Sequence, residues 1–107
     1  MKFEALEVAI QLAQALRHIL EQLRRHDADL ADQARRGTTS AALSISEARS
    51  RIGRDRAHLF RVGLGSVSEV DTALRLATAW GFLEEADLVT AFALCDRLRA
   101  MLWRLTR

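Results

Sequence analysis

The chain contains no proline in 107 residues, and this absence constrains its fold more than any other feature. A proline inside a helix removes a backbone hydrogen bond and kinks or breaks the helix. Half of the residues are apolar, and the composition is dominated by alanine, leucine, arginine and glutamate, which are strong helix formers. The sequence therefore predicts long uninterrupted helices and an all-α fold.

The length of 107 residues predicts a single domain over residues 1–107. Three further features predict that this domain is soluble. The single cysteine, Cys95, cannot form an intramolecular disulfide. The first seven residues carry two acids instead of the basic start and apolar run of a secretory signal. No apolar stretch approaches the roughly 20 residues that cross a bilayer. We expect a cytoplasmic protein that does not contact the membrane.

Apolar residues recur at steps of three, four or seven residues in four segments, which is the spacing of one helix face. The four predicted faces consist of Phe3, Leu6, Ile10, Ala13, Leu20 and Leu23; Leu30, Ala34, Ala41, Ile45, Ala48 and Ile52; Phe60, Gly63, Val67, Val70, Leu74 and Ala77; and Leu88, Phe92, Cys95, Leu98, Leu102 and Leu105. Four helices of about 20 residues joined by short links predict an antiparallel up-down-up-down four-helix bundle.

Local residue types predict where these helices begin and end. Asp27 or Asp29 can cap the start of the second helix, and Gly53 can end it. Asp55 is an acceptable N-cap for the third helix, and Gly81 is expected to stop that helix.

Arginine is concentrated in the middle of the chain, although the formal net charge is only +2. Between residues 35 and 61, two acids, Glu47 and Asp55, accompany seven arginines: Arg35, Arg36, Arg49, Arg51, Arg54, Arg56 and Arg61. We call these arginines the basic band. Guanidinium groups bind phosphates or interfacial carboxylates, so the basic band predicts either RNA or DNA binding or a protein interface.

Two glycines in the third predicted helix, Gly63 and Gly65, require an explanation, because each costs about 0.5 to 1 kcal/mol relative to alanine. The functional interpretation is close contact with another subunit or a ligand, and the alternative is close packing inside the bundle. The GLGS segment lacks the lysine and the preceding strand of a phosphate-binding loop. The predicted oligomer interface consists of small residues of the second and third helices: Ala41, Ala48, Gly63, Gly65 and Ser66.

Catalytic and metal-binding patterns are absent from the sequence. A di-metal bundle needs Glu-x-x-His pairs, and no such arrangement surrounds the three histidines, His18, His26 and His58. Cys95 lies on an apolar stripe, which favours a core role over a reactive thiol. Trp80 and Trp103 are interpreted as core or interface anchors. We expect a non-enzymatic protein without cofactor or metal.

Motifs between residues 30 and 83 carry a resemblance to a known family. They are LADQARR from Leu30, then Ser40, Ile45, Glu47, Arg51, Phe60, GLGS from Gly63, Glu69, LRLA from Leu74 and GFL from Gly81. This pattern resembles the four-helix-bundle family first noted as products of intervening sequences in bacterial 23S ribosomal RNA genes. The chain departs from the usual family motif at Ala42, Ser44 and Ala48.

The resemblance implies a bundle that assembles as a ring, commonly a homopentamer, with no known enzymatic activity. A related branch comprises the accessory proteins of diversity-generating retroelements, which form basic pentameric barrels that bind nucleic acid and a reverse transcriptase. We therefore expect a nucleic-acid-binding module. The alternative is a protein scaffold or an accessory subunit, for example of a reverse transcriptase, whose arginines lie in subunit interfaces.

Overall fold

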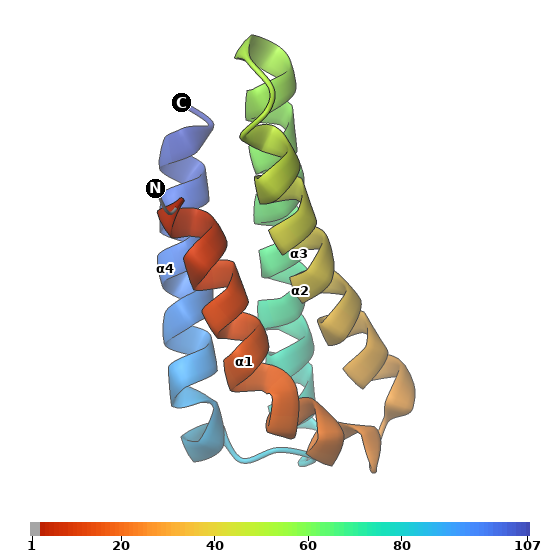
Figure 1. Ribbon diagram of the computed structural model, residues 1–107. Helices are drawn as coiled ribbons and strands as arrows, with labels where there is room; N and C mark the ends of the chain where they lie inside the picture. The colour runs from red at the N-terminus through yellow and green to blue at the C-terminus, as the bar shows by residue number, and fades with distance from the viewer. Residues whose placement is uncertain (1–2) are drawn as a thin grey trace.

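The computed structural model describes residues 3–107 and contains four long helices (Figure 1). They are α1 (Glu4–Arg24), α2 (Ala28–Ala48), α3 (Gly53–Ala79) and α4 (Val89–Leu105), and a 3-10 helix, η1 (Glu85–Leu88), precedes the last. Helices α1 and α3 each pack against both α2 and α4. Consecutive helices run in opposite directions, which confirms the predicted up-down-up-down four-helix bundle.

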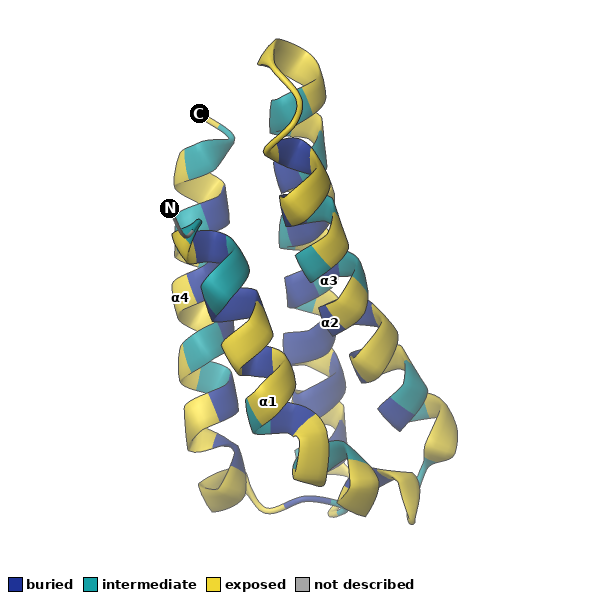
Figure 2. Ribbon diagram, viewed as in Figure 1, coloured by how far each residue is buried: buried dark blue, intermediate teal, exposed yellow. Residues whose placement is uncertain are grey.

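The buried faces of α3 and α4 agree with the predicted periodicity. Each predicted residue of α3 is buried, and in α4 only Phe92 and Leu105 are partly exposed. Figure 2 shows these buried positions on the inner sides of the helices. Phe60, which is fully buried, is the largest side chain of the core.

The predicted face of α1 was partly wrong. Ile10 and Ala13 are exposed, and the buried residues are Ala5, Val8, Ala9, Leu12, Leu16 and Leu23. Adjacent residues of a helix differ in direction by about 100°, so a shift of one residue turns the face away. Large apolar residues lie on both borders of the buried stripe of α1, so the sequence did not show where the centre of that stripe lies.

The predicted connection between α2 and α3 was also wrong in detail. Helix α2 ends at Ala48, and Ile52 lies in the connection instead of on the buried face. The Ser50 hydroxyl donates a hydrogen bond of 2.9 Å to the Glu47 carbonyl, which satisfies one of the free carbonyl groups at this end. Gly53 begins α3, and Asp55 lies in the first turn of that helix instead of capping it.

Two other helix ends confirm the sequence predictions. The Asp27 side chain accepts a hydrogen bond of 2.9 Å from the Leu30 amide and caps α2. Gly81 follows α3 with a φ of 81°, and the Phe82 amide donates to the Ala77 carbonyl at 2.8 Å. This Schellman arrangement uses the left-handed conformation that glycine adopts without strain.

None of the helices formed by residues 3–107 combines the length and apolar character that a membrane span requires. The cytoplasmic location stays a prediction.

Candidate nucleic-acid interface

The α2–α3 connection projects beyond the neighbouring ends of α1 and α4 (Figure 1). Helix α3 has 27 residues and α4 has 17, so α3 extends past the part of the bundle that α4 covers. We call residues 47–56, which form this projection, the hairpin end. Most of its residues are exposed, as Figure 2 shows, so its side chains are available to a partner.

Two arginines of the hairpin end rest on aromatic rings. The guanidinium carbon of Arg49 lies 5.2 Å from the centre of the Phe3 ring, and that of Arg56 lies 5.5 Å from the centre of the Phe60 ring. The two rings stack with centres 6.1 Å apart. The four side chains thus form a continuous stack that positions both cations through cation–π contacts.

The remaining arginines near the hairpin end differ in their partners. Arg51 forms an ion pair with Glu47 at 3.0 Å and a longer one with Asp55 at 4.0 Å. Arg54 and Arg61 are exposed and have no ion-pair partner within the part of the chain that the structure describes. These two guanidinium groups are therefore free for an anion from outside.

Arg35 and Arg36 form a separate part of the basic band, about 20 Å along α2 from Arg49 at 1.5 Å per residue. Both are exposed and border a shallow hollow of about 420 Å³, which is also lined by Thr39, Ser40, Leu43, Ser44 and Glu47. The pKa of the Asp32 carboxyl is lowered, first by a hydrogen bond from Arg24 and further by the charges of Arg24, Arg36 and Arg35. Hydroxyls and guanidinium groups here suit a phosphate chain.

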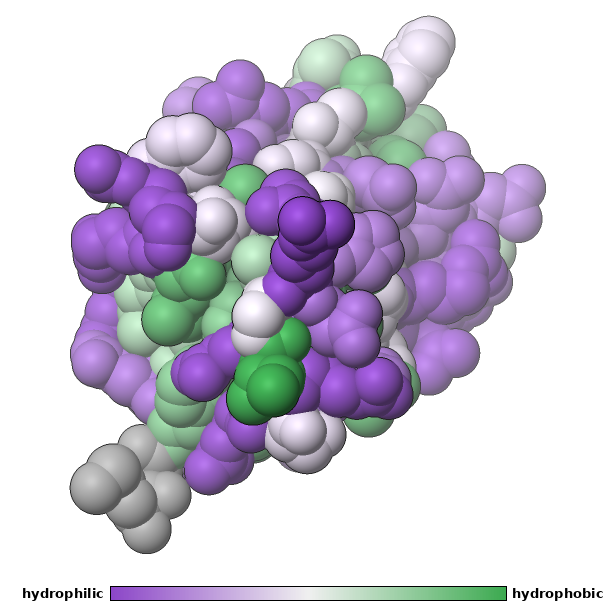
Figure 3. Space-filling model, turned by 90° about the horizontal axis from the view of Figure 1, so that it is seen from above, coloured by the Kyte–Doolittle hydropathy of each residue, from purple (hydrophilic) through white to green (hydrophobic). Residues whose placement is uncertain are grey.

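The surface seen from the hairpin end is mainly hydrophilic (Figure 3). Hydrophobic side chains appear there as small separate patches between the polar ones. A polar, cationic surface of this kind is typical of a nucleic-acid contact and atypical of an obligate apolar interface.

Three residues of the predicted oligomer interface belong to the core of the chain itself. Ala41, Ala48 and Gly63 are buried. A β carbon at Gly63 would lie 3.5 Å from Leu102 and 3.6 Å from Ile45, so close packing inside the bundle explains this glycine. The assignment of these three residues to an interface was wrong, because they present no surface to a partner.

Gly65 and Ser66 do reach the surface. A β carbon at Gly65 would meet no atom within 4 Å, and Ser66 is partly exposed. Gly65 borders a hollow of about 280 Å³ between α2 and α3, which Leu30 and Leu76 also line. The interface prediction therefore remains untested for these two residues.

Sequence reasoning missed Gly37, a glycine at a close approach of α2 and α3. A β carbon there would lie 2.8 Å from the Val70 Cγ2 atom and 3.2 Å from the Ser66 carbonyl oxygen. The hydroxyls of Ser40 and Ser66 share a hydrogen bond of 3.0 Å beside this contact. The steps of three and four residues in Ala34, Gly37 and Ala41 were the signal that could have identified it.

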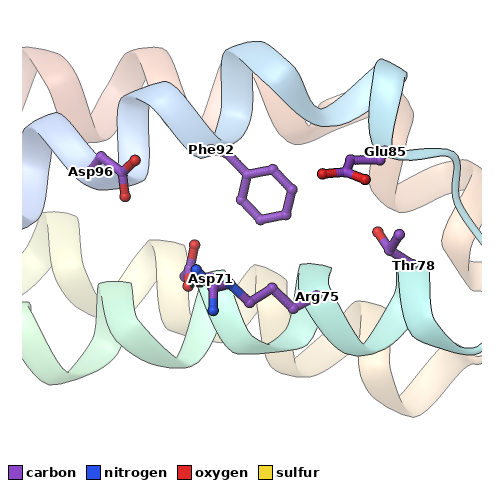
Figure 4. A pocket seen from close by; sticks show the side chains of 6 residues that line it. All are labelled: Asp71, Arg75, Thr78, Glu85, Phe92 and Asp96. Carbon is purple, nitrogen blue, oxygen red and sulfur yellow. Dashed lines mark ion pairs between the residues drawn. The ribbon is translucent and has the colours of Figure 1, made fainter.

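A second feature missed from the sequence is the polar pocket between α3 and α4 (Figure 4). Its volume is about 290 Å³, and it is lined by Asp71, Arg75, Thr78, Glu85, Phe92 and Asp96. The Asp71 carboxylate, in a residue only 4% exposed, pairs with Arg75 Nε at 3.2 Å and with Arg99 at 3.5 Å. Arg99 also donates to Asp96 at 2.6 Å, so the buried carboxylate is held by an ion-pair network.

The remaining candidate residues are the cysteine, the two tryptophans and the possible metal ligands. Cys95 is buried, and burial, followed by the charge of Asp71, raises the pKa of its thiol to about 12, so the core interpretation of Cys95 is confirmed. Trp80 and Trp103 are 70% and 57% exposed, which excludes a core role and leaves the interface interpretation open. Across residues 3–107, no three His, Cys, Asp or Glu side chains are grouped in a way that could hold a metal ion.

Comparison with known proteins agrees with this architecture. The family model for the 23S rRNA-intervening sequence protein matches residues 1–104. A crystal structure from Bacteroides thetaiotaomicron VPI-5482, described as a protein with unknown function from the S23 ribosomal protein family, superposes with a TM-score of 0.84. The superposition covers 96% of this chain and 98% of that chain at 15% sequence identity, and therefore shows a shared fold. No curated protein matches the chain significantly.

Proposed function

The chain belongs to the 23S rRNA-intervening sequence protein family, and we propose that it is a non-enzymatic module that binds RNA or DNA through its basic band. The observation that carries this proposal is the projecting, mostly exposed hairpin end, which contains Arg49, Arg51, Arg54 and Arg56. A projection of this kind can approach a phosphate backbone without a clash from the rest of the bundle.

The contacts of these arginines support phosphate binding in particular. Arg49 and Arg56 are positioned by the stacked Phe3 and Phe60 rings, which lowers the entropy that each side chain loses on binding. Cation–π contact uses the face of the guanidinium plane and leaves its edge N–H groups available to oxygen atoms. The expected contacts go to the backbone, so we expect weak sequence specificity.

Self-association is the second part of the proposal, with the ring that the family resemblance implies. A β carbon at Gly65 of α3 would meet no atom of the described residues within 4 Å, and Leu76, which is 45% exposed, lines the same hollow about three turns further along α3. A helix of a second copy can approach closely where a side chain is missing. A ring would also display several hairpin ends together and raise the apparent affinity for a long polyanion.

A protein scaffold, for example an accessory subunit of a reverse transcriptase, is the alternative function. The unpaired guanidinium groups of Arg54 and Arg61 favour it equally, because carboxylates of a neighbouring subunit would satisfy them as well as phosphates do. Substitution of the arginines separates the two functions, because interface arginines are needed for assembly and phosphate-binding arginines are not.

The test measures binding of a labelled duplex DNA and a labelled RNA hairpin by fluorescence anisotropy across a salt series. Each phosphate neutralised adds about 0.9 to the slope of log affinity against log salt on duplex DNA. We expect the variant with Arg49, Arg51, Arg54 and Arg56 changed to glutamine to lose about three to four units of slope. Its matched control carries glutamine at four exposed arginines elsewhere, Arg17, Arg24, Arg25 and Arg97.

The control variant loses the same formal charge and should keep most of the slope. Wild-type protein without salt-sensitive binding at about 50 mM salt, where phosphate contacts are strong, would refute the nucleic-acid function. A glutamine variant that dissociates into folded monomers would instead support the scaffold function.

A further inference from the structure

The apex of the hairpin end carries an apolar side chain. Ile52 is 86% exposed, the most exposed of the large hydrophobic residues of the described chain. Its backbone is extended, with φ of −132° and ψ of 160°, and Gly53 follows with a φ of 59°. The left-handed conformation at Gly53 turns the chain directly into α3, so Ile52 is the last residue of the connection before α3.

Cations surround this apolar apex on both sides in the sequence. Arg49 and Arg51 precede Ile52, and Arg54 and Arg56 follow it, with Glu47 and Asp55 as the acids of the hairpin end. The hairpin end therefore has an excess of two positive charges around one exposed isoleucine. The exposed side chain contributes almost no burial to the bundle and is accessible to a partner.

We propose that Ile52 is a wedge that inserts between two base pairs of a nucleic-acid duplex from the minor-groove side and bends the duplex. This inference rests on the proposed nucleic-acid function and specifies how the protein contacts the duplex. Proteins that bend DNA through the minor groove frequently insert apolar side chains between base steps and place arginine or lysine in the same groove. Ile52 between Arg51 and Arg54 supplies both parts.

The dimensions of the hairpin end favour the turn over a helix as the inserted element. The DNA minor groove is about 6 Å wide, and an α-helix with its side chains is about 10 to 12 Å across. Neither α2 nor α3 can enter such a groove, whereas the extended residues between them can. The contact with the groove is thus limited to the apex, and the flanking arginines meet the phosphates on its borders.

A lipid surface is a poorer fit for the same feature. Membrane-surface segments bury a complete apolar helix face in the headgroup region, and the hairpin end offers one isoleucine. Burial of one such side chain, together with two excess positive charges, is too little for stable membrane anchoring. Insertion between bases requires only one side chain, so the duplex is the partner that matches the surface.

The test is a bending measurement on a duplex DNA of about 30 base pairs with a donor and an acceptor dye at its two ends. We expect the wild-type protein to raise energy transfer, as a wedge-induced bend of about 20 to 90° would. Ile52→Ser should bind with an unchanged salt slope and lose the rise in energy transfer. Val89→Ser, at a valine at the start of α4 that is 65% exposed, is the matched control and should bend the duplex as the wild type does.

Three results would overturn the wedge while leaving the nucleic-acid function standing: salt-sensitive binding without bending, bending by Ile52→Ser at the wild-type level, or loss of bending in Val89→Ser as well. A wild-type protein that binds neither duplex DNA nor RNA would overturn both inferences. Binding to phosphatidylserine vesicles that depends on Ile52, with no Ile52 effect on the duplex, would also overturn the wedge and identify a lipid surface as the partner.

Discussion

Gly37 of α2 lies so close to Val70 of α3 that a β carbon at Gly37 would sit 2.8 Å from the Val70 Cγ2 atom. The Ser66 carbonyl oxygen would be 3.2 Å away from the same β carbon. Neither neighbour can move easily, because one is a β-branched side chain and the other belongs to the helix backbone. The α2–α3 hairpin, which carries the basic band, is therefore held together at a point where only glycine fits.

Gly37→Ala should destabilise the bundle, and Gly65→Ala should stabilise it. Overpacking costs about 1 to 3 kcal/mol, which exceeds the gain of about 0.5 to 1 kcal/mol from replacing a helical glycine. At Gly65 no atom of the described residues lies within 4 Å of the new β carbon, so within one subunit only the gain remains. Urea denaturation followed by circular dichroism measures both, and equal stabilisation by the two variants would contradict the close approach.

The aromatic stack at the hairpin end predicts different stability effects for its arginines. Arg49→Gln and Arg56→Gln remove cation–π contacts with Phe3 and Phe60 and should each lower stability by about 0.5 to 1 kcal/mol. Arg54→Gln removes no ion pair with the described residues and should leave the denaturation midpoint almost unchanged. If all three variants have the same midpoint, the stack does not stabilise the fold.

The buried carboxylate of Asp71 predicts a larger loss of stability than the arginine substitutions do. Asp71→Asn removes the charge that forms ion pairs with Arg75 and Arg99, and contacts between charged groups of this kind contribute about 1.5 to 3 kcal/mol. Because both arginines are partly exposed to water, we expect a loss near the lower limit, about 1.5 kcal/mol. Glu85→Gln, in the same pocket at an exposed position, is the control and should change stability little.

The sequence predicted the bundle well wherever the apolar pattern was regular. In α3 and α4, large apolar residues form one stripe each, and every predicted position is buried or partly buried. In α1, alanines at positions 5 and 9 occupy the buried face, while Ile10 lies outside it. Because alanine positions do not mark which face of a helix is buried, the sequence left the buried face of α1 open. That face depends on which partner helix packs against α1.

The candidate interface was only partly predictable for a related reason. The arginines were identified by count, but their contacts with Phe3 and Phe60 depend on how α1 lies beside the hairpin end. Ile52 continued the helical period of α2 and was therefore placed on its buried face. The helix ends four residues earlier, at Ala48, and this shift turns a predicted core residue into the exposed apex.

Cys95 predicts a stability change at alkaline pH. Burial and the charge of Asp71 raise the pKa of its thiol from 9.0 to about 12. The unfolded chain therefore loses this proton at lower pH than the folded chain does, and stability should be complete below pH 9 and should fall as the pH rises from about 9 towards 12. Cys95→Ala should remove this alkaline component, and a thiol reagent at pH 8 should label the folded protein far more slowly than the unfolded one.

Gly65→Leu tests self-association without disturbing the fold. The new side chain meets no atom of its own chain within 4 Å of the β carbon, so the monomer should fold with wild-type helicity. If α3 of a second copy packs at this point, the leucine overfills the contact at a cost of about 1 to 3 kcal/mol and shifts the equilibrium towards smaller species.

Light scattering at micromolar concentration should give the mass of an oligomer, expected to be a pentamer, for the wild type and a lower mass for Gly65→Leu. Ser50→Leu, a substitution of similar size at the exposed hairpin end, should keep the wild-type mass. A wild-type protein that is monomeric at this concentration would exclude the ring, and an oligomer unaffected by Gly65→Leu would place its interface on another face of the bundle.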